Sequence, residues 1–288
     1  MDGETAVSNP SESDDREHSV DDAATSRRKV VMAYRMVQIA VVAGLVWKGS
    51  FFRIADQVDG EIPLADPFFP DWARSASVVR WAYLVAVLTT LVGALIANRW
   101  GRLRTLAVAA AVASLSILCV HQATYNDATF TTSWWTQLWS FWFCTRMERD
   151  RPDRLLRRGA FAARAIGSMI LIGGAVGKWT SEYWSGEVFY DIYFRERQYW
   201  TFNWVRGHFG PETLREIATW YSRGVVVTET VVGLGMWLMP PRAAATVGVV
   251  LFTSIALFSN HLLFSVMWCL IGLSAVGFLV PATPSSKP

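Results

Sequence analysis

Residues 165–194 read AIGSMILIGGAVGKWTSEYWSGEVFYDIYF, and the character of this segment changes half-way along. Its first half is apolar enough to enter a lipid bilayer as a helix, and its second half is aromatic and acidic. Gly173, Gly174 and Gly177 form a small-residue face of the G-x-x-x-G kind, which lets a second membrane helix approach closely. We therefore expect a membrane helix that packs on a neighbour and ends at one surface of the bilayer.

Lys178 ends this helix, and two interpretations of it are open. A lysine at the end of an apolar helix can extend its stem to water between interfacial tryptophans, here Trp179 and Trp184. Alternatively, Glu182 and the aromatic side chains crowd Lys178, and partial desolvation makes its amine available as a base.

The composition places the whole chain in a membrane. Of its 288 residues 52% are hydrophobic, 15 are Trp, and several apolar runs approach the length that a helix needs to cross about 30 Å of hydrocarbon. The net charge of +3 comes mostly from arginines between these runs, so it indicates topology and not nucleic-acid binding. We predict an all-α polytopic membrane protein, a bundle of about eight transmembrane helices with two long extracytoplasmic loops that carry interfacial helices.

The distribution of arginines assigns each loop between predicted spans to one side of the membrane. The apolar runs predict spans at about 30–47, 78–98, 104–121, 130–145, 161–179, 221–239, 243–261 and 262–280. If all eight cross, the arginines near 27–29, 99–104, 146–158 and 242 fall on one side. The loops 48–77 and 180–220 then fall on the other side. The positive-inside rule therefore predicts a multi-pass protein of the cell membrane with both termini in the cytoplasm.

Three regions follow from this pattern. Residues 1–26 are acidic and predicted to be a disordered tail, because they cannot bury enough apolar surface to fold alone. They do not resemble a signal peptide, so the first span is expected to remain as an anchor. Residues 27–281 form the membrane domain, and 282–288 form a short tail. In the outer loop 180–220, Pro211 is expected to open a short interfacial helix.

Ionisable residues gather near the predicted outer face. Lys48, His121, Lys178 and His261 all lie at the outer ends of predicted spans. Glu229 instead lies within an apolar span, where an unpaired charge costs at least a few kcal/mol. We therefore expect this carboxylate to be protonated, or paired with Lys178 or Lys48. A structural bond between helices would satisfy Glu229 equally well.

Lys178, Glu229 and His121 are the catalytic candidates, and the candidate ligand-binding residues are Lys48, Trp179, Glu182, Trp184, Asn260 and His261. Solvation of His121 and a hydrogen-bonded corner at Asn260–His261 are the simpler alternatives. No metal site is predicted, because no histidine pair has ligand spacing. The three cysteines, Cys119, Cys144 and Cys269, are expected to be buried in helices.

Several motifs together resemble the HTTM membrane domain, the transmembrane part of the vitamin K-dependent gamma-carboxylases and of bacterial relatives. They are YRMVQIAVVAGLVWK in the first span, GAVGKW followed by EYWSGE, ET in the sixth span and SNH late in the chain. The resemblance covers roughly residues 30–280, and DoxX-like membrane proteins are a more distant likeness. It implies that Lys178, ahead of Trp184-Ser185-Gly186, corresponds to the lysine that deprotonates vitamin K hydroquinone. Asp127 stands where the carboxylases have a histidine.

Two classes of function remain open at this point. The resemblance implies a carboxylase-like lyase that uses a reduced quinone as cofactor, with Lys178 as the base and Glu229 tuning it. The alternative is a non-catalytic membrane scaffold or a lipid-binding subunit, in which the same residues hold helices together. A transporter would need broken helices in paired halves, and the sequence contains no convincing internal repeat. Membrane lipids and a quinone- or lipid-sized ligand are the expected partners, and nucleic acid is not.

Overall fold

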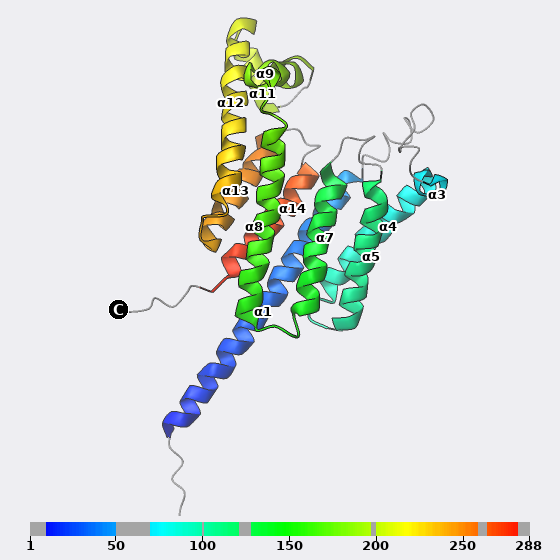
Figure 1. Cartoon of the computed structure of the whole chain (residues 1–288), viewed down its shortest axis with the longest axis vertical. Helices are drawn as coiled ribbons and strands as arrows, with labels where there is room; N and C mark the ends of the chain where they lie inside the picture. Colours follow the sequence, from blue (N-terminus) through cyan, green and yellow to red (C-terminus); the bar gives the residue numbers. More distant parts are fainter. Residues whose placement is uncertain are drawn as a thin grey trace, which may run out of the picture.

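A computed structural model describes residues 10–49, 70–99, 101–120, 128–196, 200–258 and 264–281, and the regular elements among these residues are all helices (Figure 1). In chain order they are α1 (Pro10–Lys48), α3 (Asp71–Arg74), α4 (Ala76–Leu95), α5 (Gly101–Cys119), α7 (Ala128–Arg146), α8 (Pro152–Val176), α9 (Ser181–Trp184), α10 (Glu187–Phe189), η1 (Tyr190–Glu196), α11 (Trp200–His208), α12 (Pro211–Gly235), α13 (Pro241–Phe258), α14 (Phe264–Ala275) and η3 (Val276–Leu279).

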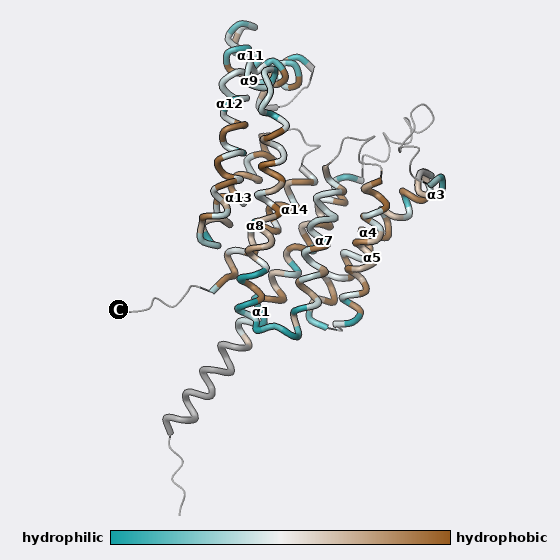
Figure 2. The backbone as a smooth tube through the Cα atoms, viewed as in Figure 1, coloured by the Kyte–Doolittle hydropathy of each residue, from teal (hydrophilic) through white to brown (hydrophobic). Residues whose placement is uncertain are grey.

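Five helices of the described chain are long and apolar enough to cross a membrane. They are Ala24–Lys48 of α1, together with α4, α5, α8 and α13. Figure 2 shows their apolar residues in a band across the middle of the bundle, with hydrophilic residues toward both ends. The stretch Ser265–Leu279 is a shorter apolar helix. The described part of the chain is therefore all-α and built of membrane-spanning lengths of helix, and its long helices overlap the apolar runs of the sequence.

The first helix begins earlier than its apolar run. Residues 10–26, for which the sequence predicts disorder, continue α1 toward the N-terminus. The acidic composition of this segment is compatible with a helix start, because carboxylates near an N-terminus interact favourably with the helix dipole.

Helix α7 lies against several neighbours and buries a polar face. In the part of the bundle that the structure describes, Gln137 donates to Gln38 on α1 and to Thr90 on α4, and Thr129 lies 2.6 Å from the Ser265 hydroxyl on α14. Hydrogen bonds of this kind join membrane helices where no hydrophobic driving force can do so. The buried polar residues of α7 are Thr129, Thr132, Ser133, Thr136, Gln137 and Ser140.

Helix α12 differs from its prediction. Pro211 opens one continuous helix of 25 residues, where the sequence predicts a short interfacial helix followed by a separate span. Proline at the first helical position favours the start, and no second proline follows until Pro240, after the helix has ended at Gly235. The upper half of α12 carries α9 and α11 beyond the ends of the other helices (Figure 1).

The close approach between α8 and α12 depends on a glycine that the sequence analysis did not select. A Cβ atom on Gly233 of α12 would lie 2.9 Å from the Ile172 side chain of α8. Of the predicted face of Gly173, Gly174 and Gly177, Gly174 lies against α12, where a Cβ atom would be 3.4 Å from a Glu229 oxygen. Gly173 and Gly177 are exposed, and a Cβ atom on Gly173 would meet no atom within 4 Å. Within the described chain, the predicted packing face is therefore confirmed for Gly174 alone.

Candidate functional site

An ion pair joins the end of α8 to the middle of α12. The Lys178 ammonium donates to both carboxylate oxygens of Glu229, each at 2.6 Å. The side chains are 24% and 12% exposed, respectively, so the pair is largely removed from solvent. This confirms the expectation that Glu229 is paired and identifies Lys178, not Lys48, as its partner.

Gly174 lies directly beside the pair. A Cβ atom on this glycine would lie 3.4 Å from a Glu229 oxygen and 3.6 Å from the Lys178 nitrogen. The two predicted tryptophans lie next to the pair: Trp179 donates to the Thr230 hydroxyl at 3.2 Å, and its ring stacks on Trp184 with centroids 5.2 Å apart. Two stacked aromatic rings therefore lie at the end of α8, bonded to α12 next to Glu229.

The turn after α9 is pressed against α12. Gly186 adopts a φ of 82°, in the left-handed region that favours glycine. A Cβ atom there would lie 2.4 Å from the Cα of Thr219, so a side chain cannot be accommodated without movement of a backbone. Thr219 also donates from its hydroxyl to the Ser185 carbonyl at 2.6 Å. The glycine of the Trp184-Ser185-Gly186 motif thus permits a backbone contact.

Two further side chains of α12 bond the carbonyls at the end of α9. Ser222 donates to the Tyr183 carbonyl at 2.5 Å, and Arg223 donates to the Trp184 carbonyl at 3.0 Å. The Arg223 guanidinium also lies 5.5 Å from the centre of the Trp184 ring. Carbonyls at a helix C-terminus lack partners within their own helix, and α12 supplies them here.

Glu182 does not take part in the ion pair, contrary to the expectation that it crowds Lys178. Its carboxyl is fully exposed, and its pKa is held below the usual value by its own backbone N–H and by the hydroxyls of Ser181 and Thr180. The pKa of the Tyr183 hydroxyl is raised, mainly by burial and also by the Glu229 charge. Tyr183 therefore lies within the electrostatic influence of the pair, and the sequence analysis did not select it.

Two cavities adjoin this region and share two residues. The carboxylate cavity, of about 290 Å³, lies between α12 and α13 and is lined by Tyr221, Gly224, Val225, Thr228, Glu229, Leu251, Ser254, Ile255 and Phe258. The aromatic cavity, of about 520 Å³, is lined by Phe189, Phe194, Thr201, Phe202, Trp204, Val205, Ile217, Tyr221 and Phe258. Because Tyr221 and Phe258 line both, the cavities adjoin along α12.

The aromatic cavity rests on a small core of its own. Phe189 packs against the rings of Phe194 and Phe202, with centroids 6.1 Å and 5.5 Å apart. Tyr221 closes this cluster from α12, at 4.5 Å from Phe189. Thr201 lines the cavity with a buried hydroxyl for which the described residues offer no hydrogen-bond partner.

The remaining predicted residues are not brought to this site. Lys48 is buried at the end of α1 and lines neither cavity. His121, Asn260 and His261 lie outside the described residues. The cysteines are free, with Cys144 and Cys269 buried as expected and Cys119 partly buried.

Several residues of the site were missed by the sequence analysis. Thr219, Ser222 and Arg223 were not selected, because only the folded chain brings them to the α9 carbonyls. The aromatic spacing in FYDIYF was a signal for the aromatic core, because residues three or four apart share a helix face.

Comparisons with models of protein families, with curated proteins and with solved structures found no match to this chain. The HTTM resemblance therefore stays a prediction from the motifs.

The ion pair predicts a specific coupling. We expect Lys178→Met and Glu229→Gln each to lower the free energy of unfolding by about 1–3 kcal/mol, because each change leaves a poorly solvated polar partner. The double variant should lose less than the sum of the two single losses, since it leaves no orphaned charge. Thermal unfolding of the detergent-solubilised wild type, the two single variants and the double variant completes this double-mutant cycle. Additive losses would show that the contact contributes no coupling energy.

Proposed function

We propose that this protein binds a lipid- or quinone-sized amphiphile in the two adjoining cavities along α12. The shared lining by Tyr221 and Phe258 supports this most strongly, because it makes one long apolar site out of two small ones. Ligand sites are mostly apolar and place a few polar groups to fix orientation. Here Thr201 lies toward one end and Glu229 toward the other.

The orientation proposed from the arginines places this site on the extracytoplasmic side. The turns after α4 and α7 lie at one end of the bundle, and α9 and α11 lie at the opposite end (Figure 1). The first end carries Arg99, Arg146 and Arg149, which the positive-inside rule assigns to the cytoplasm. Eight crossings then leave both termini in the cytoplasm.

Cysteine labelling tests this orientation. In a variant whose three native cysteines are replaced by serine, single cysteines at Ser11 and at Ser285 should resist a membrane-impermeant maleimide in intact cells. Both should react after the cells are opened. A cysteine at Glu212 should react in intact cells and serves as the positive control. Labelling of Ser11 or Ser285 positions from outside would contradict the eight-span arrangement.

The cavity can be filled without disturbing the fold. Gly224 lines the carboxylate cavity, and a Cβ atom there would meet no atom within 4 Å. Gly173 has the same open surroundings and lines neither cavity, so it is a matched control. Replacing an exposed helical glycine also removes a helix penalty of about 1 kcal/mol, so both leucine variants should fold.

We expect the wild-type protein to co-purify with a quinone or lipid that organic extraction and mass spectrometry detect. Gly224→Leu should lose at least about tenfold of that ligand per protein, because its side chain occupies the bound volume. Gly173→Leu should retain wild-type levels. Equal ligand content in the two variants would overturn the proposal and favour the alternative, a scaffold without a ligand site.

Base catalysis on a quinol is a second candidate, favoured by the position of Glu229. The carboxylate lines the cavity, whereas Lys178 does not. A hydroquinone bound there would therefore meet Glu229 first and transfer its hydroxyl proton to the carboxylate. The Lys178 ammonium would then stabilise the resulting quinol anion. This gives Glu229 the proton-accepting role that the family resemblance assigns to Lys178.

Spectroscopy under argon separates the two roles. A naphthohydroquinone bound to the wild-type protein should show the red-shifted absorption of its anion. Glu229→Gln should abolish this band, because an amide accepts no proton, and Lys178→Arg should keep it, because a guanidinium maintains the charge. Loss of the band in Lys178→Arg together with its retention in Glu229→Gln would return the role to Lys178. Binding without the band in wild type would leave only the ligand-binding function.

A further inference from the structure

A second pair of adjoining cavities lies at the other end of the bundle, where the arginines gather. The apolar groove, of about 510 Å³, runs between α1 and α14 and is lined chiefly by Met32, Met36, Ile39, Trp268 and Ile271. The basic pocket, of about 270 Å³, lies between the start of the apolar part of α1 and the turns after α4 and α7. Arg28, Val31 and Asn98 line both, so the two spaces are contiguous.

The basic pocket carries an excess of positive charge. Four arginines line it, namely Arg27, Arg28, Arg99 and Arg104, against the single carboxylate of Glu148. That carboxylate already accepts a hydrogen bond from Arg104 at 3.4 Å. The structure gives Arg27, Arg28 and Arg99 no ion pair with the described residues. The pocket is therefore suited to an anion.

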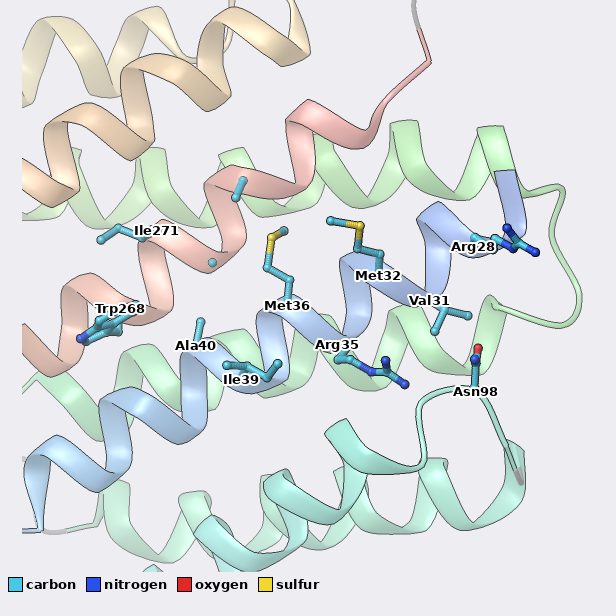
Figure 3. Close-up of a pocket in the computed structure, with 12 residues that line it drawn as sticks. Arg28, Val31, Met32, Arg35, Met36, Ile39, Ala40, Asn98, Trp268 and Ile271 are labelled. Carbon is cyan, nitrogen blue, oxygen red and sulfur yellow. The ribbon is translucent and has the colours of Figure 1, made fainter. Parts of the chain in front are cut away.

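The apolar groove is open on its outer side. Met32 and Ile39 are 57% and 55% exposed, so the face of α1 beside the groove meets the surroundings of the bundle. Figure 3 shows Met32 and Met36 between α1 and α14, Arg28 at one end of the row, and Arg35 on the side of α1 that faces Asn98. Arg35 also donates to the Ala94 carbonyl at 3.3 Å, which fixes its position.

We propose that these two cavities bind an anionic phospholipid, with its phosphate in the basic pocket and an acyl chain along the apolar groove. Guanidinium groups pair well with phosphate oxygens because their planar N–H fork matches them. Basic pockets between membrane helices bind anionic head groups for the same reason. A free anion would satisfy the arginines but would leave the apolar groove without an occupant, so charge and shape together favour a lipid.

This site is separate from the one proposed above for a quinone- or lipid-sized ligand, because no residue lines both pairs of cavities. Loss of ligand in Gly224→Leu therefore does not bear on this proposal, and the reverse also holds.

Native mass spectrometry of the full chain in detergent tests it. We expect dioleoyl phosphatidylglycerol to bind at least about tenfold more tightly than dioleoyl phosphatidylcholine, because only the former carries a net negative charge. The double variant Arg28→Gln/Arg99→Gln, which removes two of the exposed arginines of the basic pocket, should greatly reduce this preference, and Arg28→Lys/Arg99→Lys should retain part of it. Arg102→Gln, an exposed arginine of α5 that lines neither cavity, is the matched control and should bind as wild type.

Three outcomes would overturn the proposal. The first is equal binding of the two lipids by the wild-type protein. The second is an unchanged preference in Arg28→Gln/Arg99→Gln, provided that its thermal unfolding resembles that of Arg102→Gln. The third is equal occupancy by glycerol phosphate at the same concentration, which would identify a site for a soluble anion and not for a lipid. If Arg28→Gln/Arg99→Gln fails to fold, Arg28→Gln alone gives the same comparison, because Arg28 is exposed and lines both cavities.

Discussion

The two oxygens of one carboxylate hold α12 to the rest of the bundle at the level of the candidate site. Glu229 cannot remain alone in an apolar helix, and Lys178 reaches it from the end of α8 with bonds of 2.6 Å. Deeper along the same pair of helices, Gly233 admits Ile172, and Ser168 donates to the Gly233 carbonyl at 2.6 Å. Because α12 is fixed to α8 in this way, it does not need to pack closely on α13. The space left between α12 and α13 is the carboxylate cavity.

The sequence was informative where a polar group had few possible partners. The apolar runs located the long helices, since a helix is the one way to satisfy backbone groups over such a length in lipid. The position of Glu229 in an apolar run predicted its pairing with a lysine, because a buried carboxylate must be neutral or paired with a cation. The extent of α12 was not predictable on these grounds. The predicted span begins at about residue 221, and the carbonyl that Ser222 bonds belongs to a segment 39 residues earlier in the chain.

Packing by glycine was predicted only in part for a related reason. A sequence shows where side chains are small, but the neighbour that approaches is a property of the fold. Gly174, which was predicted, lies beside the ion pair, and Gly233, which was not, admits α8, whereas the predicted Gly173 faces open space. The cavities are harder still to predict, because a cavity forms where the side chains of neighbouring helices leave space unfilled. Tyr221 and Phe258 lie 37 residues apart and become neighbours only when α12 and α13 stand side by side.

Buried polar groups in this protein fall into two classes, and the difference between them carries the functional argument. On α7, Gln137 donates to Thr90 of α4, and the Thr129 hydroxyl shares a hydrogen bond with the Ser265 hydroxyl of α14, so these groups are satisfied within the chain and their role is structural. The hydroxyl of Thr201 is also buried, but the described residues offer it no hydrogen-bond partner. An unsatisfied buried donor costs free energy that a bound molecule can recover. The basic pocket attracts an anion for a different reason, because Arg27, Arg28 and Arg99 are exposed cations whose charge is not neutralised by an ion pair with the described residues.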